Sequence, residues 1–168
     1  IFIIAVGKYG GCNSTIFKSE WEYVMDDLKE HSKIIENFVA SVRRQLKDHA
    51  CCVYSNNIQY KCNLKEKEVT VVPDASISCR VYNKRKSSFF DIPRLVLEVI
   101  SPSTEQYDHN EKKELYRQQE IDEYWILDGE KRKIESYTLY YDQDGKPQYY
   151  LFNTVTGPNK DKLFIFHF

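Results

Sequence analysis

The sequence predicts a mixed α/β (α+β) fold in which helices pack on a central sheet. The chain has 168 residues, of which 42% are hydrophobic and 14% aromatic, so it can bury a sizeable core and fits a single domain over residues 1–168. Two stretches have helical periodicity, and short β-type segments lie between and after them. One such segment, residues 94–100, is apolar on both faces, which is typical of a strand covered by helices on both sides.

The N-terminal part predicts a strand and a long helix. Residues 1–6 are an apolar run that we expect to form a core strand, and a chain that begins with Ile1 instead of Met predicts that the true N-terminus is missing. Residues 19–47 have apolar side chains in steps of three and four, which predicts one amphipathic helix or two helices in line. These side chains belong to Trp21, Val24, Met25, Leu28, Ile35, Phe38, Val39, Val42 and Leu46.

The rest of the chain predicts short strands and a second helix. We expect strands at residues 51–54, 58–62, 69–79, 94–100, 124–127, 134–140, 149–152 and 163–168, and a basic loop at 84–88. A helix is expected over residues 108–119, with Leu115 and Tyr116 on its apolar side. The dipeptides Asp128-Gly129 and Asp144-Gly145 predict turns between the strands that flank them.

Two carboxylates stand out as a candidate metal site. Glu98 lies in the middle of the apolar strand 94–100, where a carboxylate must be paired, protonated or bound to a cation. Asp74 follows Pro73, which marks an edge or a bulge and would direct the next side chain out of the sheet. A buried Glu satisfied by an Arg or a helix terminus, and a simple turn Asp, would explain each residue alone. Together on neighbouring strands, the two carboxylates would suit one hard cation such as Mg²⁺ or Mn²⁺.

The second predicted helix contains a lysine on its packed side. Lys112 shares a stripe with Leu115 and Tyr116, so it either has a function or extends along the edge of the core with its ammonium in water. Lys113 is turned away by about 100° and is expected to face solvent. Asp108 and Glu111 have the spacing of a capping box, so we expect Asp108 to cap the helix, with a role in the site as the alternative.

Four uncommon clusters occur in order between Val72 and Leu127. They are Pro73-Asp74, the run Leu-Glu-Val-Ile-Ser-Pro-Ser-Thr at 97–104, the pattern Asp-x-x-x-Lys at 108–112, and Glu-Tyr-Trp-Ile-Leu-Asp at 123–128. In this order they resemble a large family of mostly uncharacterised bacterial proteins with a restriction-endonuclease-like domain, part of the PD-(D/E)xK nuclease superfamily. Upstream, His31 followed four residues later by Ile35 resembles a helix of the same family.

The resemblance implies a PD-(D/E)xK nuclease fold with a central mixed sheet flanked by helices. It also implies that Asp74, Glu98 and the backbone carbonyl of Val99 bind a divalent cation. The third position of the ExK element is Ile100, and the family is thought to supply its lysine from the following helix, which makes Lys112 the candidate. In two departures, the spacing between residues 1–5 and His31 is longer than usual, and Arg94 stands where the family often has Asp.

The resemblance implies a Mg²⁺-dependent endonuclease that hydrolyses phosphodiester bonds of DNA, with Asp74, Glu98 and Lys112 as catalytic residues, and metal-assisted hydrolysis fits these side chains. The alternative is a nuclease-fold protein that has lost catalysis and binds nucleic acid or a protein partner. A purely structural protein would leave Glu98 unexplained.

Further residues are candidates for contact with substrate or for support of the site. They are His31, Glu36, Asp108, Arg94, Lys84, Arg85 and Lys86. His31 is equally well explained as a packed helix histidine. The basic loop residues Lys84, Arg85 and Lys86, and the pair Arg43-Arg44, are candidate contacts to phosphate. For each group alone, ordinary surface charge is the simpler explanation.

Composition bounds the partners and the location. The 24 Lys and Arg against 25 Asp and Glu give a net charge of −1, which is less basic than expected for a protein that coats DNA non-specifically. No apolar run is long enough to span a membrane. The five cysteines (Cys12, Cys51, Cys52, Cys62 and Cys79) contain no CxxC pair, so we expect unpaired thiols, no zinc site and a reducing, cytoplasmic location. We also expect a homodimer, with the tyrosine-rich C-terminal strands as a candidate interface.

Overall fold

The computed structural model describes residues 2–6, 31–47, 49–64, 67–79, 92–156 and 163–167. Its centre is a six-stranded sheet in the order β2-β5-β6-β7-β8-β9. The strands are β2 (Cys52–Ser55), β5 (Ala75–Ser78), β6 (Leu95–Ile100), β7 (Glu123–Asp128), β8 (Lys133–Tyr141) and β9 (Pro147–Thr156). Strands β6 and β7 run parallel and the other neighbours run antiparallel. The predicted fold class, with a central mixed sheet, is therefore confirmed.

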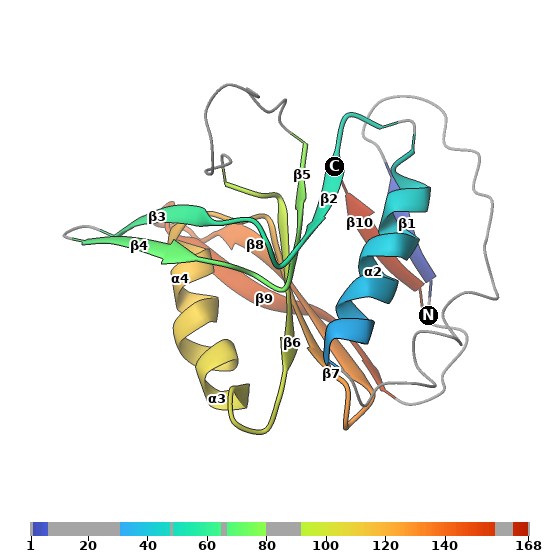
Figure 1. Ribbon diagram of the computed structural model, residues 1–168. Helices are drawn as coiled ribbons and strands as arrows, with labels where there is room; N and C mark the ends of the chain where they lie inside the picture. Colours follow the sequence, from blue (N-terminus) through green and yellow to red (C-terminus); the bar gives the residue numbers. More distant parts are fainter. Residues whose placement is uncertain are drawn as a thin grey trace.

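Helices cover both faces of this sheet, as Figure 1 shows. Helix α2 (His31–Gln45) packs on one face, where Phe38 meets Trp125 with ring centroids 6.4 Å apart. On the other face lies a continuous helical segment made of α3 (Glu105–Tyr107), a π-helical turn η1 (Asp108–Lys112) and α4 (Lys113–Gln118). All six residues of β6 are buried, because each of its faces is covered by one of these helical layers.

Two smaller sheets complete the described part of the chain. Strands β3 (Tyr60–Leu64) and β4 (Lys67–Val71) form an antiparallel ribbon. Strands β1 (Phe2–Val6) and β10 (Leu163–His167) pair in parallel. In Figure 1 the ribbon extends to one side of the main sheet, above α4, whereas β1 and β10 lie on the side of α2.

The single strand predicted over residues 69–79 is wrong. The chain forms two strands there, β4 in the ribbon and β5 in the main sheet, with Pro73 and Asp74 between them. Proline has no N–H to donate to a ladder, so the pairing stops at this point and resumes with a different partner strand. The break therefore places Asp74 at the end of the main sheet instead of inside a strand.

The second predicted helix also differs from expectation. It begins at Glu105, so Asp108 is inside the helix and does not cap it; Thr104 is the residue before the first turn. The π-helical turn is wider than an α-helical turn and changes which side chains face the sheet. Lys113, expected in solvent, has its Nζ 3.6 Å from the centroid of the Tyr137 ring and is half-buried. For the first predicted helix, residues 31–45 are confirmed, and residues 19–30 lie outside the described part of the chain.

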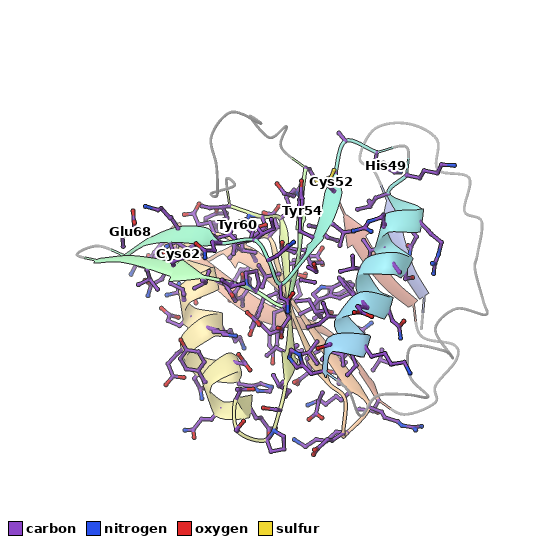
Figure 2. The ribbon with its side chains drawn as sticks, viewed as in Figure 1. His49, Cys52, Tyr54, Tyr60, Cys62 and Glu68 are labelled. Carbon is purple, nitrogen blue, oxygen red and sulfur yellow. A yellow bond between two sulfur atoms is a disulfide. The ribbon has the colours of Figure 1, made fainter. Side chains whose placement is uncertain are left out.

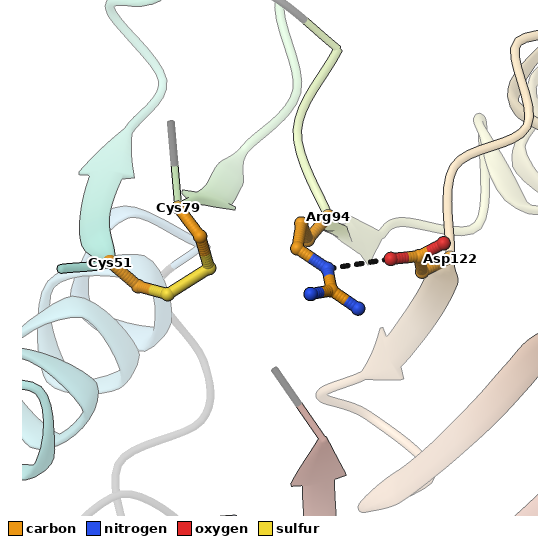
Figure 3. Close-up of a disulfide and its surroundings, with 4 residues drawn as sticks. All are labelled: Cys51, Cys79, Arg94 and Asp122. Atoms are coloured by element: carbon orange, nitrogen blue, oxygen red, sulfur yellow. Dashed lines mark hydrogen bonds and ion pairs between the residues drawn. A yellow bond between two sulfur atoms is a disulfide. The ribbon is translucent and has the colours of Figure 1, made fainter. Parts of the chain in front are cut away.

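The cysteines are not all unpaired, because Cys51 and Cys79 form a disulfide (Figure 3). Cys51 directly precedes β2 and Cys79 directly follows β5. These strands are antiparallel and their register pairs Cys52 with Ser78, so the pair beyond it is Cys51 and Cys79. Cys52 is exposed on β2 and Cys62 is buried on β3, both as free thiols (Figure 2). The prediction of a reducing, cytoplasmic location thus loses one of its arguments and stays a prediction.

The turn at Gly145 is as predicted, with a positive φ of 72° that glycine adopts without strain. Within the part of the chain that the structure describes, no helix is both long and apolar enough to cross a bilayer.

Candidate active site

Asp74 is held at the edge of the site by two neighbouring elements. Its Oδ2 accepts a hydrogen bond from the backbone N–H of Val99 on β6, at 2.8 Å. The Nε2 of His31, at the start of α2, lies 3.2 Å from the same oxygen and donates to the carbonyl oxygen of Val99 at 2.9 Å. Because one nitrogen contacts both oxygens, the Asp74 carboxylate and the Val99 carbonyl face a common point.

Glu98 is buried on β6, where its side chain contacts the α3–α4 segment. Its side chain is 1% exposed, and each oxygen has a protein partner. The hydroxyl of Tyr116 donates to Oε1 at 2.6 Å, and the Nζ of Lys112 lies 3.0 Å from Oε2. Burial raises the pKa of Glu98 to about 7, against the lowering effects of Lys112 and Tyr116. The negative charge of Asp74 raises this pKa further.

Lys112 bridges two buried carboxylates. Its Nζ lies 2.9 Å from Oδ1 of Asp108, one helical turn earlier, as well as 3.0 Å from Glu98. Burial alone would lower the pKa of Lys112, but the charges of Glu98 and Asp108 outweigh it and the pKa is raised. Lys112 therefore stays a cation in the site, with its side chain 23% exposed.

The charges of this group do not balance. Once Glu98 is ionised, above about pH 7, Asp74, Glu98 and Asp108 supply three carboxylates, against the ammonium of Lys112 and the imidazole of His31 beside Asp74. A divalent cation would offset the excess, and the oxygens of Asp74, Glu98 and Val99 are the hard ligands that Mg²⁺ or Mn²⁺ prefers. Among the described residues no cluster of three or more metal-binding His, Cys, Asp or Glu side chains occurs, so such a site would depend on two carboxylates and a backbone carbonyl. Mg²⁺ sites commonly have few protein ligands because the ion keeps several waters, so the residues fit the ion.

The other candidate residues are not part of this group. Glu36 is exposed on α2, turned from His31 by about 140°. Arg94 precedes β6, about 13 Å along the strand from Glu98, and its Nε bonds Asp122 Oδ2 at 2.6 Å (Figure 3). Arg43 is exposed near the far end of α2, about 18 Å from His31. Lys84, Arg85 and Lys86 lie outside the described residues.

Tyr116 is a site residue that the sequence does not single out. It is 1% exposed, and burial and the charge of Glu98 raise the pKa of its hydroxyl well above the usual range, so it stays a hydrogen-bond donor. The sequence places Tyr116 on the same helix stripe as Lys112, and this shared stripe is the available signal. The periodicity of the helix does not predict which residue the Tyr116 hydroxyl bonds. That residue, Glu98, lies on a strand whose position relative to the helix the periodicity does not reveal.

A second polar group supports the same helical segment. The Nδ1 of His109 lies 2.9 Å from the carbonyl oxygen of Glu105, and its Nε2 lies 2.9 Å from Oε2 of Glu135 on β8. The hydroxyl of the buried Tyr124 on β7 donates to the backbone carbonyl of Asp108 at 2.9 Å. Two strands of the sheet thus fix the π-helical turn that contains Asp108 and Lys112.

Known proteins share this fold and sequence pattern. Residues 20–160 match the model of the Uma2 family, described as "Putative restriction endonuclease", and the chain belongs to this family. It is 30% identical over 82 residues to an uncharacterized protein of Synechocystis, a match that covers 48% of this chain and 43% of that protein. A crystal structure described as a "putative nuclease" from Anabaena variabilis has a TM-score of 0.54 at 15% identity, covering 71% of this chain and 66% of that one. The chain thus spans under half the length of the Synechocystis protein and about two thirds of the Anabaena one.

Proposed function

We propose that this chain is a nuclease that hydrolyses phosphodiester bonds of DNA with the help of Mg²⁺ or Mn²⁺. Asp74, Glu98 and the carbonyl of Val99 would hold the cation. When bound, the ion would stabilise negative charge on the reacting phosphate and lower the pKa of a bound water. Membership of the Uma2 family, described as "Putative restriction endonuclease", supports this proposal.

The protein groups around the ion have separate tasks. Lys112 presents an ammonium beside Glu98 and would stabilise charge on the attacking water or on the phosphate. Tyr116 holds one oxygen of Glu98, which orients the carboxylate. His31 contacts the Asp74 carboxylate and the Val99 carbonyl, so its imidazole must move or share these oxygens when the cation binds.

One observation supports the proposal most strongly. The group contains three carboxylates and a single lysine, and two of the carboxylates, Glu98 and Asp108, are almost fully buried. Ionising Glu98 in this buried position is costly, as its raised pKa of about 7 reflects, and carboxylates perturbed in this way are typical of functional sites such as cation sites.

Plasmid nicking tests the proposal. Wild type and Asp74→Asn are incubated with supercoiled plasmid in Mg²⁺ or Mn²⁺ at low salt, where phosphate contacts are strongest. We expect wild type to nick the plasmid and the variant to lose at least about a hundredfold in rate, since it loses a ligand of the ion. Glu36→Gln is the control, because Glu36 is an exposed carboxylate on α2 away from the site. Single-stranded DNA and RNA, tested in parallel, decide the substrate class.

A wild type that binds DNA but cleaves neither DNA nor RNA would contradict the proposal and favour a nuclease fold used as a binding module. The near-neutral net charge of −1 is compatible with this outcome. The expected homodimer stays a prediction, and sedimentation of the purified protein would test it.

A further inference from the structure

Lys112 has two carboxylate partners of different kinds. Glu98 lies on β6, across the layer boundary from the helix, and is also a proposed ligand of the cation. Asp108 lies on the same helical segment as Lys112, four residues earlier, and is not a proposed ligand. The pair within the segment depends only on the helix, whereas the pair between strand and helix must change when Glu98 binds an ion.

We propose that Asp108 is a positioning residue that keeps the ammonium of Lys112 in the site when the Glu98 carboxylate is taken up by the cation. This inference rests on the proposed function. Without Asp108, a divalent ion at Glu98 would repel the nearby ammonium of Lys112. Because the Lys112 side chain is already 23% exposed, it would then turn out of the site into solvent. With Asp108 present, the ammonium of Lys112 has a carboxylate partner 2.9 Å away, and it keeps this partner after the cation has bound Glu98.

The surroundings of Asp108 fit this task. Asp108 is 2% exposed, in a helix interior where a capping role is excluded by the earlier start at Glu105. Its backbone carbonyl is fixed by the hydroxyl of Tyr124, and the neighbouring His109 is fixed by Glu135. Two strands therefore fix the backbone that carries the Asp108 carboxylate, and this carboxylate contacts Lys112.

A double-mutant cycle on cation binding tests this inference. The dissociation constant of Mn²⁺ is measured by titration calorimetry, without DNA, for wild type, Asp108→Asn, Lys112→Met and the double variant. Asp108→Asn should weaken Mn²⁺ binding about tenfold in the wild-type background, because the ion then displaces the ammonium of Lys112 from Glu98, its only remaining carboxylate partner, and the lost ion pair opposes binding. In the Lys112→Met background the same change should have less than about a threefold effect, since no ammonium remains to be held.

Glu111→Gln is the matched control, because Glu111 is an exposed carboxylate on the same helical turn. It should leave the Mn²⁺ affinity unchanged. Nicking rates add a second readout: Asp108→Asn should lower kcat more than it raises KM, and should cause no further loss once Lys112 is absent.

Equal weakening in both backgrounds, or no weakening in either, would overturn the role assigned to Asp108 while leaving the proposed function intact. A wild type that takes up no Mn²⁺ would remove the proposed function and this inference with it. Should Asp108→Asn not fold, a crystal of wild type with Mn²⁺ decides the question. Lys112 should then remain within about 3 Å of Asp108, and its departure from Asp108 would overturn the inference.

Discussion

Replacing Glu98 with glutamine should make the stability of the cation-free protein less dependent on pH. Glu98 is 1% exposed, and its pKa rises from 4.5 to about 7 in the folded protein, mainly because burial disfavours the charged form. The folded state therefore holds this proton more tightly than the unfolded state does. The resulting stabilisation is complete below about pH 4.5 and is lost as the pH rises through about 7.

The size of this effect follows from the difference between the two pKa values. Each pKa unit corresponds to about 1.4 kcal/mol, so the rise from 4.5 to about 7 corresponds to about 3–4 kcal/mol of unfolding free energy. The amide of a glutamine has no proton to lose in this range, so the Glu98→Gln variant should lack this contribution. Between about pH 5 and pH 8, wild type should lose about 2–3 kcal/mol relative to Glu98→Gln.

Urea unfolding in EDTA at several pH values across this range measures the difference. Glu111→Gln is the control, because its exposed carboxylate should leave the pH dependence of wild type unchanged. Addition of Mn²⁺ at about pH 8 should then stabilise wild type, which has the ligand, more than Glu98→Gln. A parallel pH dependence of wild type and Glu98→Gln would refute the claim that Glu98 is buried with an elevated pKa.

Three further outcomes are expected. Lys112→Met should slow nicking about a hundredfold, because one charge beside the phosphate is lost, while Lys146→Met, which alters an exposed lysine in the turn between β8 and β9, should not. Tyr116→Phe removes the donor to Glu98 and should lower the unfolding free energy at about pH 8 by about 2 kcal/mol in urea titrations; an unchanged value would contradict the hydrogen bond. In labelling with a thiol reagent at about pH 8, the exposed Cys52 should react at once and Cys62 only on unfolding. Cys62 is protected because it is buried and its pKa is raised to about 11, so rapid reaction of both thiols would contradict this burial.

Sequence patterns predict the features that depend on local periodicity. The apolar run around Glu98 predicts a strand covered on both faces, and all residues of β6 are buried. The helix stripe that contains Lys112 predicts a lysine facing the packed side, and its ammonium contacts the buried Glu98. Pro73 predicts an edge or a bulge, and it lies in the break between β4 and β5, although the single strand expected over residues 69–79 is wrong. Hydrophobic pattern and proline chemistry are properties of a few neighbouring residues, so they can be interpreted without the fold.

The features that the sequence does not predict depend on pairing between distant segments. The disulfide of Cys51 and Cys79 spans 28 residues and follows from the register of β2 and β5, which no local pattern reveals. The expectation that Lys113 faces solvent is wrong because its ammonium lies over the ring of Tyr137 on the distant strand β8, a contact that no local pattern reveals. The prediction of a cap at Asp108 is wrong because the start of the helix, about one turn earlier, has no side-chain capping bond that would mark it.

Anomalous diffraction from crystals of the protein soaked in Mn²⁺ is the most direct test of the proposed cation site. A single strong peak should lie between the carboxylates of Asp74 and Glu98 and the carbonyl oxygen of Val99, at about 2.0–2.6 Å from each oxygen. The imidazole of His31 should leave its position between Asp74 and Val99 or move aside. No peak at this position, with Lys112 still bound to Glu98 and His31 still bound to Val99 at high Mn²⁺, would contradict the cation site.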